Sequence, residues 1–233
     1  MKIVILNYTG TVGKTTLAVH FLSPRMEAPI YAIESINETA EGLGLEVEKL
    51  RGDRFRDLFR KLVTEDNAIV DVGASNVEDF MLNLEGFSGA HDDIDYFIVP
   101  VTSGTKEQKE SLAMIASLAA IGIEPEKIRV VFNRVERDVI DEFPMLFNYS
   151  EAHGNFTANP KCAIYETELF DALSVNGLSL EALLNDSTDY KQLLKDKSAD
   201  PAMREKWSDM YGLMLLAKGV NRKLDAAYSE LFS

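Results

Sequence analysis

Cysteine, long apolar runs and clustered histidines are scarce or missing in this sequence of 233 residues, and each absence excludes a class of protein. The single cysteine, Cys162, has no partner for an internal disulfide, and no Cys/His cluster has the spacing of a zinc site. No apolar run reaches the roughly 18 residues that are needed to cross a bilayer. Residues 1–8 are too short and too abruptly polar for a signal peptide. We therefore expect a cytoplasmic protein in a reducing compartment, with no transmembrane segment.

Positive charge is also scarce, because 24 basic residues face 38 acidic ones and the net charge is −14. A protein that coats DNA with its own surface usually carries a basic face. The densest positive stretch, residues 51–61, has five basic and two acidic side chains. We interpret it as the solvated face of a helix whose Phe55 and Leu58 point inward. Direct contact of this stretch with nucleic acid remains an alternative, against which the overall charge works.

Short apolar runs alternate with helical patterns along the first two thirds of the chain. The runs predict strands, and the segments between them predict helices. The alternation is typical of an α/β fold with a doubly wound, mostly parallel sheet and helices on both faces. Binding sites in such folds lie at the carboxyl ends of the strands. The expected strands are residues 3–6, 30–33, 68–72, 96–101 and 128–132, and the expected helices are residues 14–22, 53–63, 77–84 and 106–121.

Beyond residue 133 the alternation of apolar runs and helical segments becomes less regular. We expect a helix over 136–150, a short last strand over 162–165 and a helix over 166–173, with a wholly helical sequence from 180 onward. The domain organisation that we predict is therefore a core of residues 1–175 and a C-terminal helical extension, 176–233, packed on that core.

The segment Asn7–Thr16 follows the first expected strand and opens the first expected helix. Backbone N–H groups at such a turn form a concave anion site, and the helix N-terminus adds partial positive charge. Gly10 and Gly13 would permit backbone angles and a close phosphate approach that a side chain would block. Lys14 would then reach the β- and γ-phosphates of a nucleotide, and the Thr15 hydroxyl would ligate Mg²⁺. The strict phosphate-loop pattern is not met, because the position of its first glycine is a tyrosine.

An aspartate, Asp71, ends the expected strand 68–72. A carboxylate at that place needs a partner, since an unpaired buried charge is costly. Mg²⁺ beside the phosphates, held through water, is the economical partner, as in the second motif of P-loop NTPases. The alternative for Asp71, taken alone, is a cap of the helix that starts near Ser75.

These residues resemble the ParA/MinD family of deviant Walker A P-loop ATPases. Residues 9–16 fall on the family's loop Lys-Gly-Gly-x-Gly-Lys-Thr-Thr, and Asp71 matches its second motif. Residues 130–135 look like the strand that ends in the family's adenine-contacting asparagine, and residues 163–172 like its late strand and helix. The resemblance covers about residues 1–175. Within the family, the short and acidic chain is most similar to StbB-like plasmid-stability proteins.

The resemblance implies a set of site residues. It implies that Asn133 contacts the base, although an asparagine that only closes a strand with an Asx turn is the alternative. Lys14 and Asp71 would serve catalysis, and Thr15 and Asp71 would hold the metal. The nucleotide-binding loop would comprise Thr9, Gly10, Thr11, Val12, Gly13, Lys14, Thr15 and Thr16.

The departures from the family pattern bear on the rate of hydrolysis. The family's signature lysine falls on Thr9, whose hydroxyl cannot offset phosphate charge. The aspartate that positions the attacking water falls on Ile36, which leaves Glu34 as the candidate catalytic acid at that strand end. A helix-capping or simply solvated acid is the alternative for Glu34. The resemblance therefore implies that nucleotide binding is kept and that turnover is slow.

The function expected from the resemblance is a Mg²⁺-dependent ATPase that binds ATP and ADP. It would act as a nucleotide-controlled dimerisation switch in plasmid stability, partition or DNA transfer. Its partners would be a second copy of the chain and a DNA-binding adaptor protein. Two alternatives stay open, namely a small-molecule kinase or ligase on the same fold, and a nucleotide-gated adaptor with negligible hydrolysis.

Overall fold

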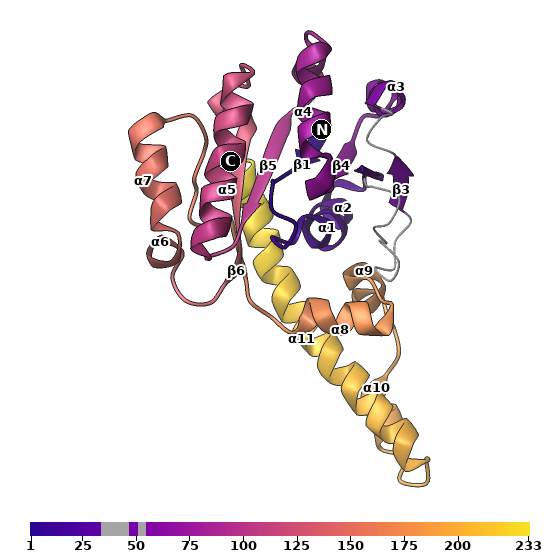
Figure 1. The fold of residues 1–233 in the computed structure, drawn as a ribbon. Coiled ribbons are helices and arrows are strands. Elements are labelled where there is room, and N and C mark those ends of the chain that lie inside the picture. Colours follow the sequence, from indigo (N-terminus) through magenta and orange to yellow (C-terminus); the bar gives the residue numbers. More distant parts are fainter. Residues whose placement is uncertain (34–46, 51–54) are drawn as a thin grey trace.

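A seven-stranded sheet forms the centre of the molecule in a computed structural model, which describes residues 1–33, 47–50 and 55–233 (Figure 1). Every strand pair is parallel, and the strand order is β3-β2-β4-β1-β5-β6-β7. The strands are β1 (Lys2–Ile5), β2 (Ile30–Ile33), β3 (Val47–Leu50), β4 (Ala68–Val72), β5 (Tyr96–Val101), β6 (Ile128–Val135) and β7 (Ala163–Tyr165). The predicted α/β class is thus confirmed.

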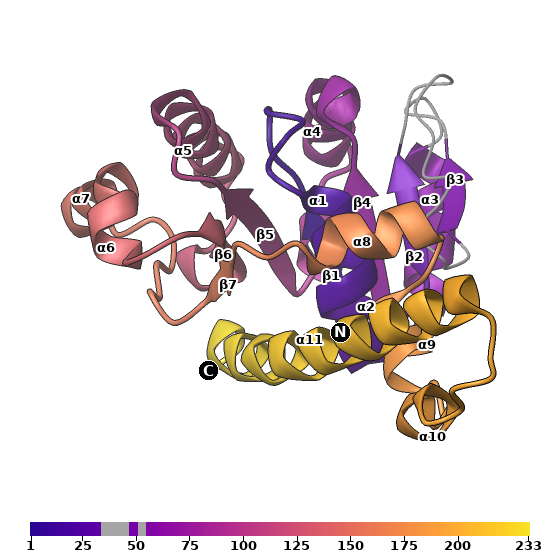
Figure 2. The ribbon, with the colours of Figure 1, turned by 90° about the horizontal axis from the view of Figure 1, so that it is seen from below.

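Helices cover both faces of this sheet (Figure 2). One face carries α3 (Phe55–Thr64), α4 (Val77–Gly86), α5 (Thr105–Ala120), α6 (Val139–Glu142) and α7 (Pro144–His153). The other face carries α1 (Lys14–Thr16), the π-helical η1 (Leu17–Leu22), α2 (Ser23–Met26), α8 (Leu169–Asn176), α9 (Leu180–Leu184) and part of α11 (Pro201–Leu231). The remaining elements are α10 (Tyr190–Leu194) and the 3₁₀ turns η2 (Ala74–Asn76), η3 (Ala90–Asp93) and η4 (Pro125–Lys127).

Alternation along each strand divides the core into two apolar clusters. In β1, Val4 contributes to the cluster under α3, α4 and α5, whereas Ile3 and Ile5 contribute to the cluster under η1, α8 and α11. Burial of both faces explains why this strand is a continuous apolar run in the sequence. The arrangement places β1 between β4 and β5, with its carboxyl end in the middle of the sheet edge where ligands bind in such folds.

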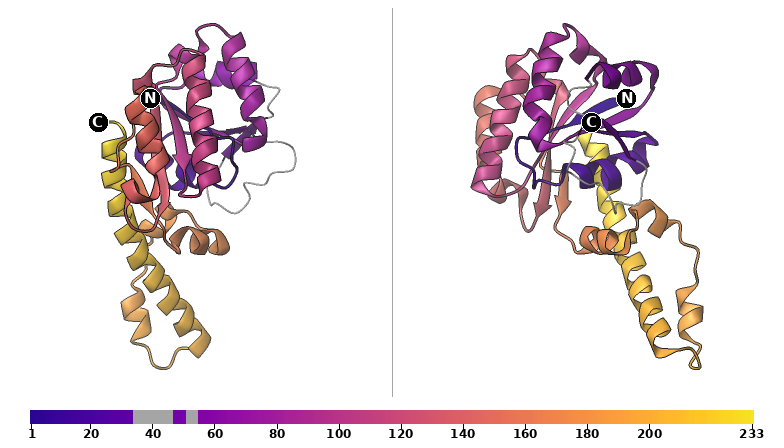
Figure 3. Two further views of the ribbon diagram at one scale, coloured as in Figure 1. Left: turned by 60° about the vertical axis from the view of Figure 1, so that its left-hand side comes forward. Right: turned by 45° about the vertical axis from the view of Figure 1, so that its right-hand side comes forward.

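The longest helix, α11, has two different environments. Its second half lies against the sheet, where Leu224 and Leu231 are buried and Asp225 accepts a hydrogen bond of 2.7 Å from Arg25 of α2. Its first half extends away from the sheet beside α10 (Figure 3). No helix in the described part of the chain is long and apolar enough to span a membrane.

Two sequence expectations were wrong in detail. The strand β3 was not anticipated, and the single helix expected over 136–150 is two helices, α6 and α7, after a longer β6. The break falls at Phe143, directly before Pro144, which has no backbone N–H to continue a helix. Asp138 caps α6 by accepting hydrogen bonds from the backbone N–H groups of Ile140 and Asp141.

Candidate functional site

The loop between β1 and α1 is held at both of its ends. At its start, Asn7 is fully buried and donates to Pro100 O at 2.8 Å and to Ser111 Oγ at 2.7 Å, while its Oδ1 accepts from the Thr9 N–H. The Tyr8 hydroxyl pairs with Ser117 of α5 at 3.0 Å, so this side chain turns toward α5. The beginning of the loop is therefore fixed to β5 and α5.

At its far end, the loop is locked by an asparagine from β6. Asn133 is 5% exposed and its Nδ2 donates to Val12 O at 2.8 Å. Gly13 follows in the left-handed region, with φ at 82°, and a Cβ built there would come within 2.5 Å of Asn133 Nδ2. Both the backbone angle and the contact require glycine at this position.

The expectation for Gly10 was wrong in one respect. This residue does not have a positive φ, and a Cβ on it would meet only Ala74 Cβ at 3.9 Å, an ordinary contact. The conformational requirement for glycine therefore applies to Gly13 and not to Gly10.

Lys14 is nearly buried and lies under its own loop. Its Nζ donates to Thr9 O at 2.7 Å and to Asn7 O at 3.3 Å, which compensates the burial of the ammonium group. These contacts place a positive charge directly behind the loop backbone. An ammonium group in this place can exchange a carbonyl for an anionic oxygen with little change in the loop.

The predicted pair of metal-binding side chains is in contact. Thr15 Oγ1 donates to Asp71 Oδ2 at 2.6 Å, and Asp71 is 3% exposed. The pair forms because β4 lies beside β1 with Asp71 opposite Ile5, so the end of β4 faces the first turn of α1. A hydroxyl and a carboxylate are hard oxygen donors of the kind that Mg²⁺ takes, usually together with water and phosphate oxygens. The donor set therefore fits Mg²⁺, although no group of three or more Asp, Glu, His or Cys side chains forms a closed metal site among the described residues.

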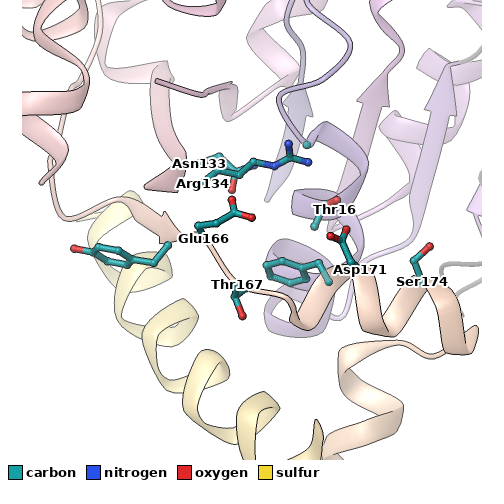
Figure 4. A pocket seen from close by; sticks show the side chains of 10 residues that line it. Thr16, Asn133, Arg134, Glu166, Thr167, Asp171 and Ser174 are labelled. Atoms are coloured by element: carbon teal, nitrogen blue, oxygen red, sulfur yellow. The ribbon is translucent and has the colours of Figure 1, made fainter. Parts of the chain in front are cut away.

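Two hollows meet at this loop. The first, of about 350 Å³ and here named the phosphate hollow, is lined by Gly10, Thr11, Gly13, Lys14, Thr15, Thr16, Asp71, Gly73, Ala74 and Arg134. The second, of about 250 Å³ and here named the side hollow, is lined by Gly13, Thr16, Asn133, Arg134, Tyr165, Glu166, Thr167, Phe170, Asp171 and Ser174 (Figure 4). Because they share Gly13, Thr16 and Arg134, an extended ligand can occupy both.

The structure therefore brings most of the predicted site residues together. Gly10, Thr11, Gly13, Lys14, Thr15, Thr16 and Asp71 surround the phosphate hollow, and Asn133 lines the side hollow. Thr9 and Val12 are buried behind the loop, where their backbone atoms hold Lys14 and Asn133. Glu34 and Ile36 lie outside the described residues.

Sequence reasoning missed Arg134 and the side chains that α8 contributes. A signal for Arg134 existed, since it directly follows the asparagine singled out as a base contact. The late strand and helix at residues 163–172 were also recognised, but no ligand-facing side chain was assigned there.

Behind the side hollow, a buried histidine connects η1 to α8. His20 is 1% exposed and its ring stacks on Phe170, with ring centroids 5.6 Å apart. Its Nδ1 accepts from the Leu180 N–H at 3.4 Å. Burial lowers the pKa of His20 to about 4, because a charged imidazolium is poorly solvated there. The ring is therefore neutral at pH 7 and acts as a packing element of the hollow's wall.

The parallel strand order, with the loop of residues 7–16 at the end of β1 and Asp71 at the end of β4, is the fold of ParA/MinD-type structures. The septum site-determining protein MinD of Pyrococcus horikoshii OT3, solved with Mg-ADP, has this fold; the two align over 79% of this chain and 89% of that one, with a TM-score of 0.51 and 13% identity. The MinC:MinD cell division complex of Aquifex aeolicus aligns with a TM-score of 0.51 and 16% identity, over 79% of this chain and 88% of that chain. No family model and no curated protein matches the sequence. The fold expected from the resemblance is confirmed.

Proposed function

We propose that this chain is a ParA/MinD-like ATPase that binds ATP or ADP with Mg²⁺ and hydrolyses ATP slowly. The observation that carries the proposal is the 2.6 Å contact between Thr15 Oγ1 and Asp71 Oδ2 at the phosphate hollow, on the loop that also holds Lys14. The fold supports it, because it is the fold in which a MinD was solved with Mg-ADP. The predicted residue roles are part of this proposal.

In this proposal each residue acts on the phosphates by position and charge. The loop backbone and Lys14 bind the β- and γ-phosphates, and Lys14 donates to phosphate oxygen in place of Thr9 O. Thr15 and Asp71 hold Mg²⁺, which neutralises charge that develops on the phosphates. Hydrolysis is slow because Thr9 stands where the family's signature lysine would add a further positive charge.

We further propose the role of a nucleotide-controlled dimerisation switch in plasmid stability, partition or DNA transfer, working with a DNA-binding adaptor protein. Support for this role is the resemblance of the loop, of Asp71 and of residues 130–135 to the ParA/MinD pattern. The net charge of −14 favours an adaptor over direct coating of DNA. A domain boundary near residue 175 is part of the same proposal.

The test is titration calorimetry of ATP, ADP and GTP with Mg²⁺, on the natural chain and on Lys14→Ala. Lys218→Ala, which removes an exposed lysine of α11, is the matched control. We expect Lys14→Ala to abolish nucleotide binding and Lys218→Ala to leave it unchanged. Equal affinity of the natural chain and Lys14→Ala would refute the assignment of the phosphate loop.

Turnover and association state are measured on the same samples. We expect phosphate release to water at less than about one turnover per second, the low end for enzymes, and a larger particle by light scattering with ATP than with ADP. Phosphate transfer to a metabolite would instead support a kinase. Dimerisation without turnover would support a nucleotide-gated adaptor.

A further inference from the structure

Arg134 has an unusual backbone conformation at the junction of the two hollows. Its φ is 55°, and among the described residues only Glu27 shares a positive φ without being glycine. The register between β6 and β7 shifts between Asn133 and Val135, so Arg134 occupies an irregularity in the strand. Left-handed backbone at a bulky residue is unfavourable and is found mainly where it serves a site.

The irregularity directs the Arg134 side chain out of the sheet. Its two neighbours in the strand, Asn133 and Val135, are buried at 5% and 1% exposure, whereas Arg134 is exposed. Figure 4 shows the guanidinium group extending from β6 across the opening, toward the loop side of the hollow. Arg134 lines both the phosphate hollow and the side hollow.

The guanidinium group has no hydrogen bond or ion pair with any residue that the structure describes. The contrast with Arg25 is direct, because Arg25 donates to Phe21 O, Asn221 Oδ1 and Asp225 and so ties α2 to α11. Arg25 is structural, whereas the donors of Arg134 are available to a ligand.

The charge balance of the phosphate hollow indicates the ligand group. Its described lining contains two cations, Lys14 and Arg134, and one anion, Asp71, in a protein whose net charge is −14. Lys14 lies behind the loop, and Arg134 comes from β6 at the junction with the side hollow. A guanidinium group binds phosphate oxygens with two parallel hydrogen bonds, which suits this open position.

We propose that Arg134 binds the inner part of the nucleotide's phosphate chain, the α- and β-phosphates, as a second cation beside Lys14. This inference rests on the proposed function, since it requires a nucleotide in the two hollows. The junction position selects the inner phosphates, because a base in the side hollow leaves them between Asn133 and the loop. Arg134 thereby favours nucleotides over nucleosides, and ADP and ATP gain equally from it.

The test compares Arg134→Ala and Arg134→Lys with Arg137→Ala, which removes the same charge from an exposed arginine that lines neither hollow. Calorimetry measures ADP and ATP with Mg²⁺, NMR titration measures adenosine, and thermal unfolding verifies that each variant is folded. We expect Arg134→Ala to bind ADP and ATP at least about 10-fold more weakly, about 1.4 kcal/mol, with adenosine unchanged. Arg134→Lys should recover part of the loss, and Arg137→Ala should match the natural chain.

Salt gives a second readout that does not depend on turnover. Because screening weakens the contact between a partly exposed guanidinium and phosphate, ADP binding by the natural chain should fall more steeply with salt than ADP binding by Arg134→Ala.

Three results would overturn the inference. In the first, Arg134→Ala and Arg137→Ala bind ADP equally well. In the second, adenosine is weakened as much as ADP, which would show that Arg134 packs on the base. In both, the natural chain still binds nucleotide and the proposed function stands. In the third, the natural chain binds no nucleotide at all, and the proposed function fails together with the inference.

Discussion

Replacing Gly13 by alanine tests how the loop is locked, and the structure gives the size of the effect. The left-handed conformation at φ 82° costs an L-residue about 1–2 kcal/mol. The new Cβ would also lie 2.5 Å from Asn133 Nδ2, so this side chain must move and give up its hydrogen bond to Val12 O. Losing a buried hydrogen bond costs about 1–3 kcal/mol. We expect Gly13→Ala to lower the free energy of unfolding by about 2–5 kcal/mol.

Urea denaturation measures this loss, and Gly10→Ala is its matched control. The control adds the same methyl group to the same loop, at a place where the nearest atom is 3.9 Å away and φ is not positive. With a urea dependence of about 3 kcal/mol per molar, the Gly13→Ala midpoint should fall by about 0.7–1.7 M. The Gly10→Ala midpoint should stay close to that of the natural chain. Equal midpoints for the two variants would contradict the geometry described for Gly13.

A double-mutant cycle with Asn133→Ala separates the two causes. Once the asparagine amide is gone, alanine at position 13 has nothing to displace, and only the backbone cost of about 1–2 kcal/mol remains. A cost that is the same in both backgrounds would show that the contact between Gly13 and Asn133 contributes nothing.

Two further predictions concern Thr15 and His20. Thr15→Val removes the hydroxyl that contacts Asp71, so the affinity for ADP should lose most of its dependence on Mg²⁺, whereas Thr15→Ser should keep that dependence. Calorimetry of ADP binding with Mg²⁺ and with EDTA measures this difference. A full Mg²⁺ effect in Thr15→Val would exclude Thr15 as a metal ligand. Burial holds the pKa of His20 at about 4, below its ordinary value of 6.5. As pH falls, the histidine is therefore protonated first in the unfolded chain, and the free energy of unfolding decreases between pH 6.5 and 4. Between pH 7.5 and 5 the natural chain should lose about 2 kcal/mol more than His20→Gln, measured by urea denaturation; an equal loss in the two proteins would mean that His20 is not desolvated.

The strand that was missed differs in composition from the central strands that were predicted. Central strands such as β1 and β4 are covered on both faces, so their composition alone identifies them. The missed strand, β3, is one of the two edge strands and has the sequence Val47-Glu48-Lys49-Leu50. Edge strands accept charged residues, and two adjacent charged residues between a valine and a leucine give neither an apolar run nor an alternating pattern.

The prediction of a single helix over 136–150 was wrong, although the sequence contains markers of the break between the two helices. Pro144 ends the preceding helical turn, and Asp138 is a typical N-cap at the start of α6. These two local markers agree with the places where the structure begins α6 and separates it from α7.

The phosphate hollow could be predicted, but the side hollow could not. The loop and Asp71 are recognisable because motif spacing and strand ends place them at one edge of a parallel sheet. The side hollow depends on the register of β6 against β7 and on the direction of α8, which place Arg134, Phe170 and Asp171 in the lining of one hollow. No local pattern encodes a register shift between two strands, so the direction of the Arg134 side chain follows only from the fold.

Asn133 lines the side hollow and also holds the loop backbone with the same side chain. The sequence left two interpretations of this asparagine, a base contact and a residue that closes a strand, and the geometry adds a third role, since Nδ2 is used to hold Val12 O. That bond uses one of the two N–H groups of Nδ2, so the second N–H and the acceptor Oδ1 both remain for a ligand in the side hollow. A group bound to Oδ1 would therefore act on the same side chain that fixes the backbone at Gly13.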